Sequence, residues 1–333
     1  MTHRIITHAS CMDGFCSAFV FKKYLAQAFE VNSSPLEIIG LKPNDIENEI
    51  VKIERSDIIL DLPPAKTQFF CWIDHHTSNR DSQVKAHHQI WKATPSCTGL
   101  LCDIAQEKQI TLPQAVKEFR HAIDIIDSAA YSFEDYKECY YLPQNPEKLS
   151  LLQKLHAIDA VFSTGDFQLN QELFAFLLQD PLPAVPQDLF DTHKIWIERF
   201  YKARLQSYQE WRTNIDTYMH FDTKSHCVIQ DDRKAKVKRG LPDRFYVFAK
   251  HRQAVYSINI KIIDDILARI GIGTNIFEKP QHHIDVGAVC KEVGKKFGQG
   301  SGGGHKVVGG CEVLVPNVDA ALEFFLEKMR QGN

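Results

Sequence analysis

Apolar runs of strand length alternate with amphipathic stretches of helical period from the N-terminus to about Tyr141. Residues 4–7, 57–60 and 69–73 form three such apolar runs, and their composition is that of buried strands. Residues 15–29 follow a helical spacing instead, which places one stripe of side chains on a single face: Phe15, Ala18, Phe19, Lys22 and Leu25. Strands that alternate with helices are typical of βαβ units, so the pattern predicts an α/β fold with a mostly parallel sheet.

The pattern changes in the second half of the chain. After a proline-rich break at residues 181–186, residues 191–218 keep the spacing of one long amphipathic helix. From His220 onwards, apolar runs such as 245–248 and 254–258 indicate strands that alternate with helical segments. We therefore predict an N-terminal domain over 1–187, a helical linker over 188–219 and a smaller α/β C-terminal domain over 220–333.

Composition narrows the class of protein. The 333 residues suffice for two domains, and the shares of hydrophobic (44%) and charged (24%) residues are those of an ordinary globular protein. No apolar run is long enough to cross a bilayer, no signal peptide is recognisable, and the nine cysteines form no C-x-x-C pair. We therefore expect a cytoplasmic protein without membrane contact. A net charge of −3 argues against a bulk binder of polyanions, so a nucleic-acid substrate would need local positive charge or metal ions.

Acidic and histidine side chains follow each of the three apolar runs. His8 and Asp13 come after the first run, Asp61 after the second, and the Asp-His-His triplet 74–76 after the third. Farther along, Asp124 and Asp127 have the spacing of side chains that share one face of a helix. Ligands of open α/β sheets gather beyond the carboxyl ends of the strands, and imidazole with carboxylate groups suits first-row divalent ions. The spacing thus indicates a metal site at one edge of the predicted sheet.

A glycine-rich segment, residues 298–306, is the second chemical signal. Its glycines allow backbone N–H groups to approach a ligand, and His305 and Lys306 add side-chain donors that suit phosphate. The segment lacks the ending of a Walker A loop, and a strand is expected to follow it, which argues against a dinucleotide-binding fingerprint. It is either a phosphate-binding loop or a flexible surface turn.

The order of these motifs resembles that of the DHH phosphoesterase superfamily with a DHH-associated C-terminal domain. The resemblance rests on ordered motifs along the chain: His8 to Gly14, Asp61, the triplet, Asp127-Ser128, and Gly302 to His305. The first motif is similar to that of the branch with nanoRNase-like (oligoribonuclease-like) and cyclic-nucleotide phosphodiesterase-like members. The resemblance implies a two-Mn²⁺ site in the N-terminal DHH domain, a mobile linker, and a C-terminal domain that grips the substrate. The active site would lie in the interdomain cleft, with residues 181–186 as a hinge.

The resemblance also implies a ligand set for two ions, which would be Mn²⁺, with Mg²⁺ or Co²⁺ as substitutes. His8 would bind the first ion, and Asp61 would bridge both. The remaining ligands, all to the second ion, would be Asp13, His75 and Asp127.

Catalytic and substrate-binding roles follow from the same resemblance. Asp74 would orient His75 from behind, and His76 would contact the scissile phosphate or assist the leaving group. The C-terminal domain would hold the substrate through five residues: Gly303, Gly304, His305, Lys306 and Lys261. Among these, Lys261 would replace the arginine of a Ser-x-Arg strand that is usual in the superfamily.

One position departs from the superfamily pattern. Two residues after His8, where an acidic or amide side chain is usual, the chain carries Ser10, a poor ligand. We expect water, Asp124 or the substrate phosphate to complete the first metal shell, in preference to an inward-turned Cys11 thiol, which would favour softer ions. Asp124 itself fits a buttress or cap better than a ligand. The basic run 233–239 fits a solvated loop better than a guide for nucleic acid.

These features predict a phosphodiesterase, a 3′–5′ or 5′–3′ exoribonuclease-like hydrolase that degrades short oligonucleotides (nanoRNA) to mononucleotides with metal-activated water. One alternative is hydrolysis of a cyclic nucleotide, a cyclic dinucleotide or an adenosine bisphosphate. Another alternative is a catalytically weakened, nucleotide-binding regulatory protein. This alternative stays open because Ser10 replaces a usual metal ligand. Hydrolysis of polyphosphate or pyrophosphate would need more cationic side chains in the C-terminal site than the sequence indicates. The expected partner is a short oligonucleotide or small nucleotide, and the oligomeric state stays open, with a homodimer among the options.

Overall fold

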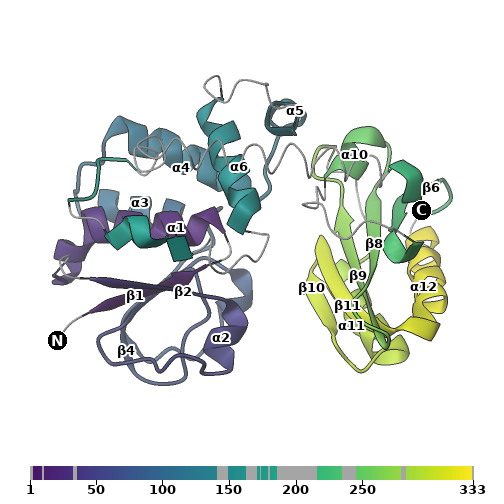
Figure 1. Cartoon of the computed structure of the whole chain (residues 1–333), viewed down its shortest axis with the longest axis horizontal. Coiled ribbons are helices and arrows are strands. Elements are labelled where there is room, and N and C mark those ends of the chain that lie inside the picture. The colour runs from purple at the N-terminus through teal and green to yellow at the C-terminus, as the bar shows by residue number, and fades with distance from the viewer. Residues whose placement is uncertain are drawn as a thin grey trace. The chain divides into compact units, whose positions relative to one another are not determined.

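The computed structural model describes residues 3–9, 11–32, 36–140, 149–162, 171–172, 174–178, 181–185, 216–234, 245–278 and 283–331. The chain forms two compact units, residues 1–205 and 206–333, which Figure 1 colours from purple to teal and from green to yellow. Most of the predicted linker, residues 188–219, lies outside the described residues, as does nearly all of the long helix predicted over 191–218. The two boundaries between the three predicted segments therefore stay predictions.

A five-stranded parallel sheet forms the centre of the N-terminal unit, in the order β2-β1-β3-β4-β5. Every pair of neighbouring strands is parallel, as the sequence predicted. The strands in chain order are β1 (Arg4–His8), β2 (Glu37–Leu41), β3 (Ile58–Leu60), β4 (Phe69–Asp74) and β5 (Ala86–Trp91). Because the strands are parallel, the residues that follow β1, β3 and β4 emerge side by side at one edge of the sheet.

Helices cover both faces of this sheet (Figure 1). The main helices are α1 (Met12–Val20), α2 (Pro43–Glu47), α3 (Cys97–Glu107), α4 (Gln114–Asp127), α5 (Phe133–Tyr140) and α6 (Leu151–Phe162). Helix α1 is buried along its whole length and packs against α3 and α4. The predicted helix 15–29 starts within α1 and continues as a π-helical turn, Phe21–Leu25, and a 3₁₀ turn, Ala26–Phe29. On the opposite face, Ile46 of α2 packs against Ile59 and Trp72.

The C-terminal unit contains a six-stranded mixed sheet in the order β10-β11-β9-β8-β7-β6. Only β7 and β8 are parallel neighbours; the other pairs are antiparallel. The strands are β6 (Met219–Asp222), β7 (Cys227–Asp231), β8 (Tyr256–Ile262), β9 (Leu267–Thr274), β10 (Gly302–His305) and β11 (Val308–Leu314). Helices α11 (Val286–Phe297) and α12 (Val318–Arg330) bury one face of the sheet around residues such as Ile258, Ile270 and Phe325.

Two predictions for the C-terminal unit were wrong. Residues 245–248, predicted as a strand, instead belong largely to α10 (Tyr246–Lys250), because Val247 and Phe248 pack as one side of a helical turn against Val228 and Ala254. A short apolar run does not by itself distinguish a strand from a buried helical turn. Part of the predicted glycine-rich loop is strand β10. The predicted strand at 254–258 is confirmed as the start of β8.

Among the helices that the structure describes, we find none with the length and apolar character that crossing a bilayer requires.

Candidate metal centre

His75 lies at the centre of three carboxylates at the carboxyl edge of the parallel sheet. Its Nε2 atom is 3.3 Å from Asp61 Oδ1, 3.4 Å from Asp127 Oδ2 and 3.7 Å from Asp13 Oδ2. Asp61 follows β3 and His75 follows β4, while Asp13 lies in the first turn of α1 and Asp127 ends α4. Four segments that are distant in sequence thus bring together the four residues predicted around the second ion.

His8 and Cys11 face the other oxygen of Asp61. His8 Nδ1 is 3.5 Å from Asp61 Oδ2, and Cys11 Sγ is 3.1 Å from His8 Nδ1 and 3.5 Å from Asp61 Oδ2. Asp61 therefore presents Oδ1 to one group of ligand-type side chains and Oδ2 to another. Among the described residues, three sets have ligand atoms within 4.8 Å of one another: His8 with Cys11 and Asp61, Asp61 with His75 and His76, and Asp13 with His75 and Asp127.

Two polar atoms of this cluster lack hydrogen bonds although they are buried. Among the described residues, Asp61 Oδ1 and His75 Nε2 have no hydrogen-bond partner, and Asp61 is 1% exposed. Buried polar atoms are almost always satisfied, because leaving one unpaired costs about 1–3 kcal/mol. Carboxylate oxygens and a neutral imidazole nitrogen are suitable ligands for divalent ions. The residues present therefore fit a divalent metal.

Electrostatic crowding in the cluster shifts several pKa values. Burial and the negative charge of Asp61 raise the pKa of Asp13 to about 6. Burial, together with Asp13 and Asp61, raises the pKa of Asp127 well above its ordinary value. Burial would lower the pKa of His75, but Asp61 and Asp13 outweigh it and raise that pKa to about 10. Burial also opposes ionisation of Asp61, yet the imidazoles of His75 and His8 hold its pKa below the usual range. Without a metal, the cluster therefore relies on protons to offset its negative charge.

The N-terminus of α3 holds Asp13 in place. The backbone N–H groups of Cys97 and Thr98 donate hydrogen bonds of 2.7 and 2.8 Å to its two carboxylate oxygens. Ser96 caps the same helix, with its Oγ accepting from the N–H of Gly99 at 2.8 Å. Free N–H groups at a helix start favour a negative charge. Sequence reasoning missed this support, although Ser96 before an apolar helical stretch is a recognisable cap.

Asp74 orients His76, not His75 as the resemblance implied. Asp74 Oδ1 accepts a hydrogen bond of 2.8 Å from His76 Nδ1, and Oδ2 accepts one of 2.7 Å from Asn79 Nδ2. His75 Nδ1 lies 2.9 Å from the carbonyl oxygen of Thr94. A carbonyl can only accept, so Nδ1 of His75 carries the proton and Nε2 is left available to a metal. The centroids of the two imidazole rings lie 4.4 Å apart, and the Asp74 carboxylate hydrogen-bonds to His76 whereas His75 Nδ1 faces the Thr94 carbonyl.

Asp124 does not reach the ligand cluster, so the expectation that it completes the first metal shell is wrong. Its carboxylate accepts hydrogen bonds from Ser96 Oγ at 2.5 Å and from Arg120 Nε at 3.3 Å. Asp124 thereby supports the cap of α3, and its prediction as a buttress is confirmed. Cys11, the less favoured alternative, is the side chain found beside His8 and Asp61. Ser10 lies outside the described residues.

Asp159 of α6 is a further residue that sequence reasoning missed. Its Oδ1 accepts a hydrogen bond of 2.9 Å from the backbone N–H of Met12, at the start of α1. No motif marks Asp159, since its role depends on α6 packing against α1. The contact fixes the turn that carries Cys11 and Asp13.

Close packing explains most of the glycine-rich segment of the C-terminal unit. A Cβ atom on Gly302 would lie 2.4 Å from the carbonyl oxygen of Cys290 in α11. Gly304 has a φ of +141°, and a Cβ there would lie 2.4 Å from Gly309 Cα. At Gly303, in contrast, a Cβ would meet no described atom within 4 Å, so packing does not require glycine there.

The remaining predicted substrate-binding residues also belong to the C-terminal unit. His305, the last residue of β10, and Lys306, which follows it, are exposed. Lys261 is half-buried on β8, opposite Arg269 of β9. Their role in binding stays a prediction. Within the basic run 233–239, Arg233 pairs with Asp231 at 2.6 Å and Asp319 at 2.7 Å, while residues 235–239 lie outside the described residues.

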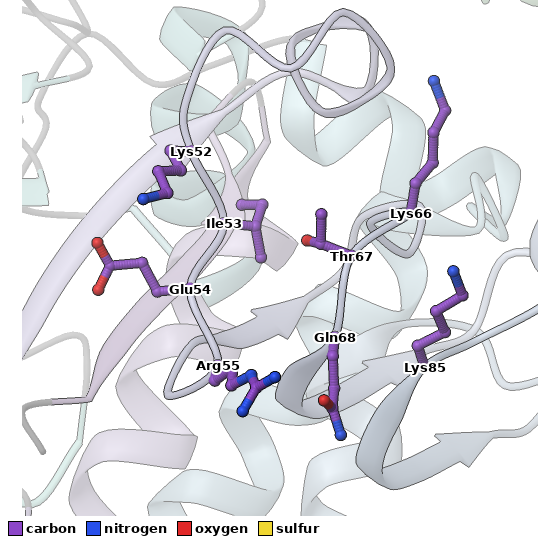
Figure 2. A pocket seen from close by; sticks show the side chains of 8 residues that line it. All are labelled: Lys52, Ile53, Glu54, Arg55, Lys66, Thr67, Gln68 and Lys85. Atoms are coloured by element: carbon purple, nitrogen blue, oxygen red, sulfur yellow. The ribbon is translucent and has the colours of Figure 1, made fainter.

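Figure 2 shows the residues that line a surface hollow of the N-terminal unit. Residues that precede β3, β4 and β5 line it, so it lies at the amino ends of these strands, whereas the cluster lies at their carboxyl ends. Four of its side chains are cationic: Lys52, Arg55, Lys66 and Lys85. None of the predicted site residues lines the hollow, so it is not the candidate site.

Comparisons with known proteins support the fold. No protein-family profile and no curated protein sequence matches the chain. Among solved structures, the pGpG-specific phosphodiesterase PggH from Vibrio cholerae is 17% identical, with a TM-score of 0.71 and a match over 100% of both chains. A DHH domain from a member of a family of ribosomal proteins is 13% identical, with a TM-score of 0.62, over 100% of this chain and 87% of that one. RecJ from Thermus thermophilus, in complex with Mn²⁺, is 12% identical, with a TM-score of 0.59, over 99% of this chain and 52% of RecJ.

These matches establish the class of fold. Along its whole length, the chain has the mixed α/β fold of DHH-domain proteins, with a parallel five-stranded sheet and a second, mixed sheet. The predicted resemblance is therefore confirmed for the fold. A structure of RecJ with Mg²⁺ also matches, at 12% identity and a TM-score of 0.54, so proteins with this fold have been solved with either ion.

Proposed function

We propose that the protein is a divalent-metal-dependent phosphodiesterase that hydrolyses short linear oligonucleotides, down to dinucleotides, to mononucleotides. One observation carries this proposal: the buried carboxylate of Asp61 presents its two oxygens to two separate groups of ligand-type side chains. A carboxylate shared in this way is the arrangement that a two-ion phosphoesterase site requires.

The ligand groups divide between two ions in this proposal. His8 and Asp61 hold one ion, and Asp61 with the three residues Asp13, His75 and Asp127 holds the other. Bound divalent ions supply Lewis acidity and lower the pKa of water, which provides a nucleophile at neutral pH. The Thr94 carbonyl and the α3 N-terminus keep His75 and Asp13 in place before any ion arrives. Mn²⁺ is the ion proposed for the position held by Asp13, His75 and Asp127.

His76 is the residue proposed to act on the phosphate itself. Its side chain is 39% exposed, whereas Asp61 and His75 beside it are buried. Burial would lower the pKa of His76, but the hydrogen bond to Asp74 raises it. Trp91 Nε1 also donates a hydrogen bond of 2.9 Å to the His76 carbonyl oxygen and fixes the backbone. A protonated, oriented imidazole can donate a hydrogen bond to a phosphate oxygen or a proton to the leaving oxygen.

A comparison with a solved phosphodiesterase supports the choice of substrate class in this proposal. The chain matches a phosphodiesterase described as specific for pGpG over the full length of both proteins, which favours a linear dinucleotide as substrate. In the C-terminal unit, Gly303 and the exposed His305 are proposed to bind a phosphate group of the substrate. Packing does not require glycine at position 303, and a residue without a side chain leaves its backbone accessible to a ligand. Identity of 17% leaves the base and the chain length to experiment.

Purified protein with Mn²⁺ should be incubated with pGpG, pApA, longer oligonucleotides, a cyclic dinucleotide, a cyclic mononucleotide and an adenosine bisphosphate. We expect mononucleotides from the linear dinucleotides, and Asp61→Asn should lower the rate by roughly a thousandfold, as expected when metal assistance worth several kcal/mol is lost. Asparagine tolerates the positive φ of 56° at this position, so the fold is retained. The exposed Asp81→Asn is the matched control and should keep full activity.

Product analysis decides between the substrate classes. Hydrolysis of only the cyclic compounds or the bisphosphate would replace the dinucleotide in this proposal. If no substrate is turned over with Mn²⁺, Mg²⁺ or Co²⁺, the proposed activity is wrong.

A further inference from the structure

Cys11 differs from the other cysteines in its exposure and its neighbours. It is half-buried, whereas the other eight cysteines are buried. Its Sγ lies 3.1 Å from His8 Nδ1 and 3.5 Å from Asp61 Oδ2. An ion placed among these three atoms would meet an imidazole nitrogen, a carboxylate oxygen and a sulfur.

The adjoining atoms of the cluster independently indicate that a cation belongs there. Asp61 Oδ1 and His75 Nε2 are buried without a hydrogen bond among the described residues, and both point into the cluster. Asp61 is 1% exposed and His75 is 8% exposed. Since Asp61 contributes its other oxygen to the His8–Cys11 group, the unsatisfied atoms and the thiol belong to one continuous site.

Capping of α1 does not explain a cysteine at this position. The thiol accepts a hydrogen bond from the N–H of Gly14, but the distance is 3.4 Å and sulfur is a weak acceptor. Serine, threonine, aspartate and asparagine are the residues that favour this position. The chain therefore carries sulfur where helix capping alone would favour oxygen.

Resting on the proposed function, we propose that Cys11 is a ligand of the first metal position, together with His8 and Asp61. The S–H bond breaks when the ion binds, the proton passes to solvent, and the thiolate sulfur bonds to the ion. A thiolate ligand favours softer ions, so this position takes an ion of the class of Co²⁺, Zn²⁺ or Fe²⁺ in preference to Mn²⁺. The second position, with imidazole and carboxylates only, has no such preference.

Titration of the metal-free, full-length protein with Co²⁺ tests this assignment without reference to activity. Coordination of cobalt by a thiolate produces a sulfur-to-metal charge-transfer band in the near ultraviolet. We expect the band in the unmodified protein and in Cys102→Ser, which changes a buried cysteine of α3. Cys11→Ser should lose the band and still cap α1, because serine is a preferred capping residue.

A second variant tests the metal preference. Cys11→Asp supplies a carboxylate, which also caps a helix, and should shift the competition between Zn²⁺ and Mn²⁺ towards Mn²⁺ by at least about tenfold. Metal content by elemental analysis measures this shift.

The outcomes separate this inference from the proposed function. Cobalt binding without a charge-transfer band, or a band that survives in Cys11→Ser, overturns the role of Cys11 while leaving hydrolysis intact. A band in a protein that hydrolyses none of the substrates overturns the proposed function and supports the ligand. Failure to bind Co²⁺ at all overturns both.

Discussion

His76 is the side chain in the cluster that is best placed to meet a substrate, because its side chain is 39% exposed whereas that of His75 is 8% exposed. We expect His76→Ala to lower kcat by about 10²–10⁴-fold, the usual contribution of a positioned acid or hydrogen-bond donor. Metal content should stay unchanged, since the proposed ligands are other residues. Steady-state kinetics and elemental analysis on the same sample measure both.

Asp74→Asn provides the companion measurement, since it leaves His76 present but removes the carboxylate that orients it. It should lower kcat less than His76→Ala. A loss of bound metal in His76→Ala would contradict the division of roles between the two imidazoles.

Gly14 determines how closely α1 approaches the end of β1. A Cβ atom at this position would lie 2.1 Å from the carbonyl oxygen of His8, and backbone cannot move aside as a flexible side chain can. Gly14→Ala should therefore destabilise the N-terminal unit by about 1–3 kcal/mol and displace His8. Urea unfolding gives the stability, and weakened metal binding gives the displacement. Gly303→Ala is the control, because its Cβ would meet no described atom within 4 Å.

The sequence predicted which residues gather at the site but not every contact between their side chains. The positions of His8, Asp13, Asp61 and His75 after strand-like runs were enough to expect them together, because parallel strands align their ends. Asp127, at the end of a helix, was expected there from the resemblance to the superfamily. The sequence did not reveal which imidazole Asp74 contacts, since that depends on the direction in which the backbone turns after β4. Cys11 was ranked below Asp124 as a first-site side chain for a similar reason: Asp124 is held away by Ser96 and Arg120.

At the scale of elements, the start of α3 supports the metal centre through its backbone. Ser96→Ala removes the helix cap and the partner of Asp124, and should cost about 0.5–2 kcal/mol of stability. Because Cys97 and Thr98 at the same helix start hold Asp13, metal affinity should fall together with stability. Thermal unfolding and isothermal titration with Mn²⁺ measure the two quantities. Ser96→Thr, which can also cap, should restore most of both.

Elements of the C-terminal unit were harder to predict than those of the parallel sheet. Residues 245–248 have the composition of a strand, but packing against Val228 and Ala254 makes them a helical turn. The glycines of β10 suggested a loop, but Gly302 and Gly304 allow a strand to lie close against α11 and β11. Strand propensity depends on what a segment packs against. Glycine can be required by close packing as well as by a turn.

At the scale of the whole molecule, metal binding and folding should be linked through pH. In the folded, metal-free protein the pKa of Asp13 is about 6, above the usual carboxyl value of about 4. Ionisation of Asp13 therefore opposes folding increasingly as pH rises from about 4, at a final cost of roughly 3 kcal/mol. Asp127 acts in the same direction. Protonated His75 stabilises the fold fully below about pH 6.5, and this contribution is lost as pH rises towards 10.

The metal-free protein should therefore lose stability between about pH 4 and about pH 8, as measured by urea unfolding in the presence of a chelator. Saturating Mn²⁺ should remove most of this slope, because the ion replaces the protons as compensating charge. Asp13→Asn should flatten the slope without added metal. Stability that rises with pH over this range would contradict the crowding of carboxylates described above.

Asp61 has a left-handed backbone, with a φ of 56° where β3 ends. Aspartate, asparagine and glycine adopt this conformation most readily. Few other substitutions at this position would therefore be tolerated without destabilising the fold. If the proposed hydrolysis is the activity of this chain, a descendant that lost it would keep its architecture most easily by acquiring asparagine or glycine at this position. Under the proposed function, either residue at the end of β3 in another chain of this fold would then indicate that the reaction was lost while the fold was kept.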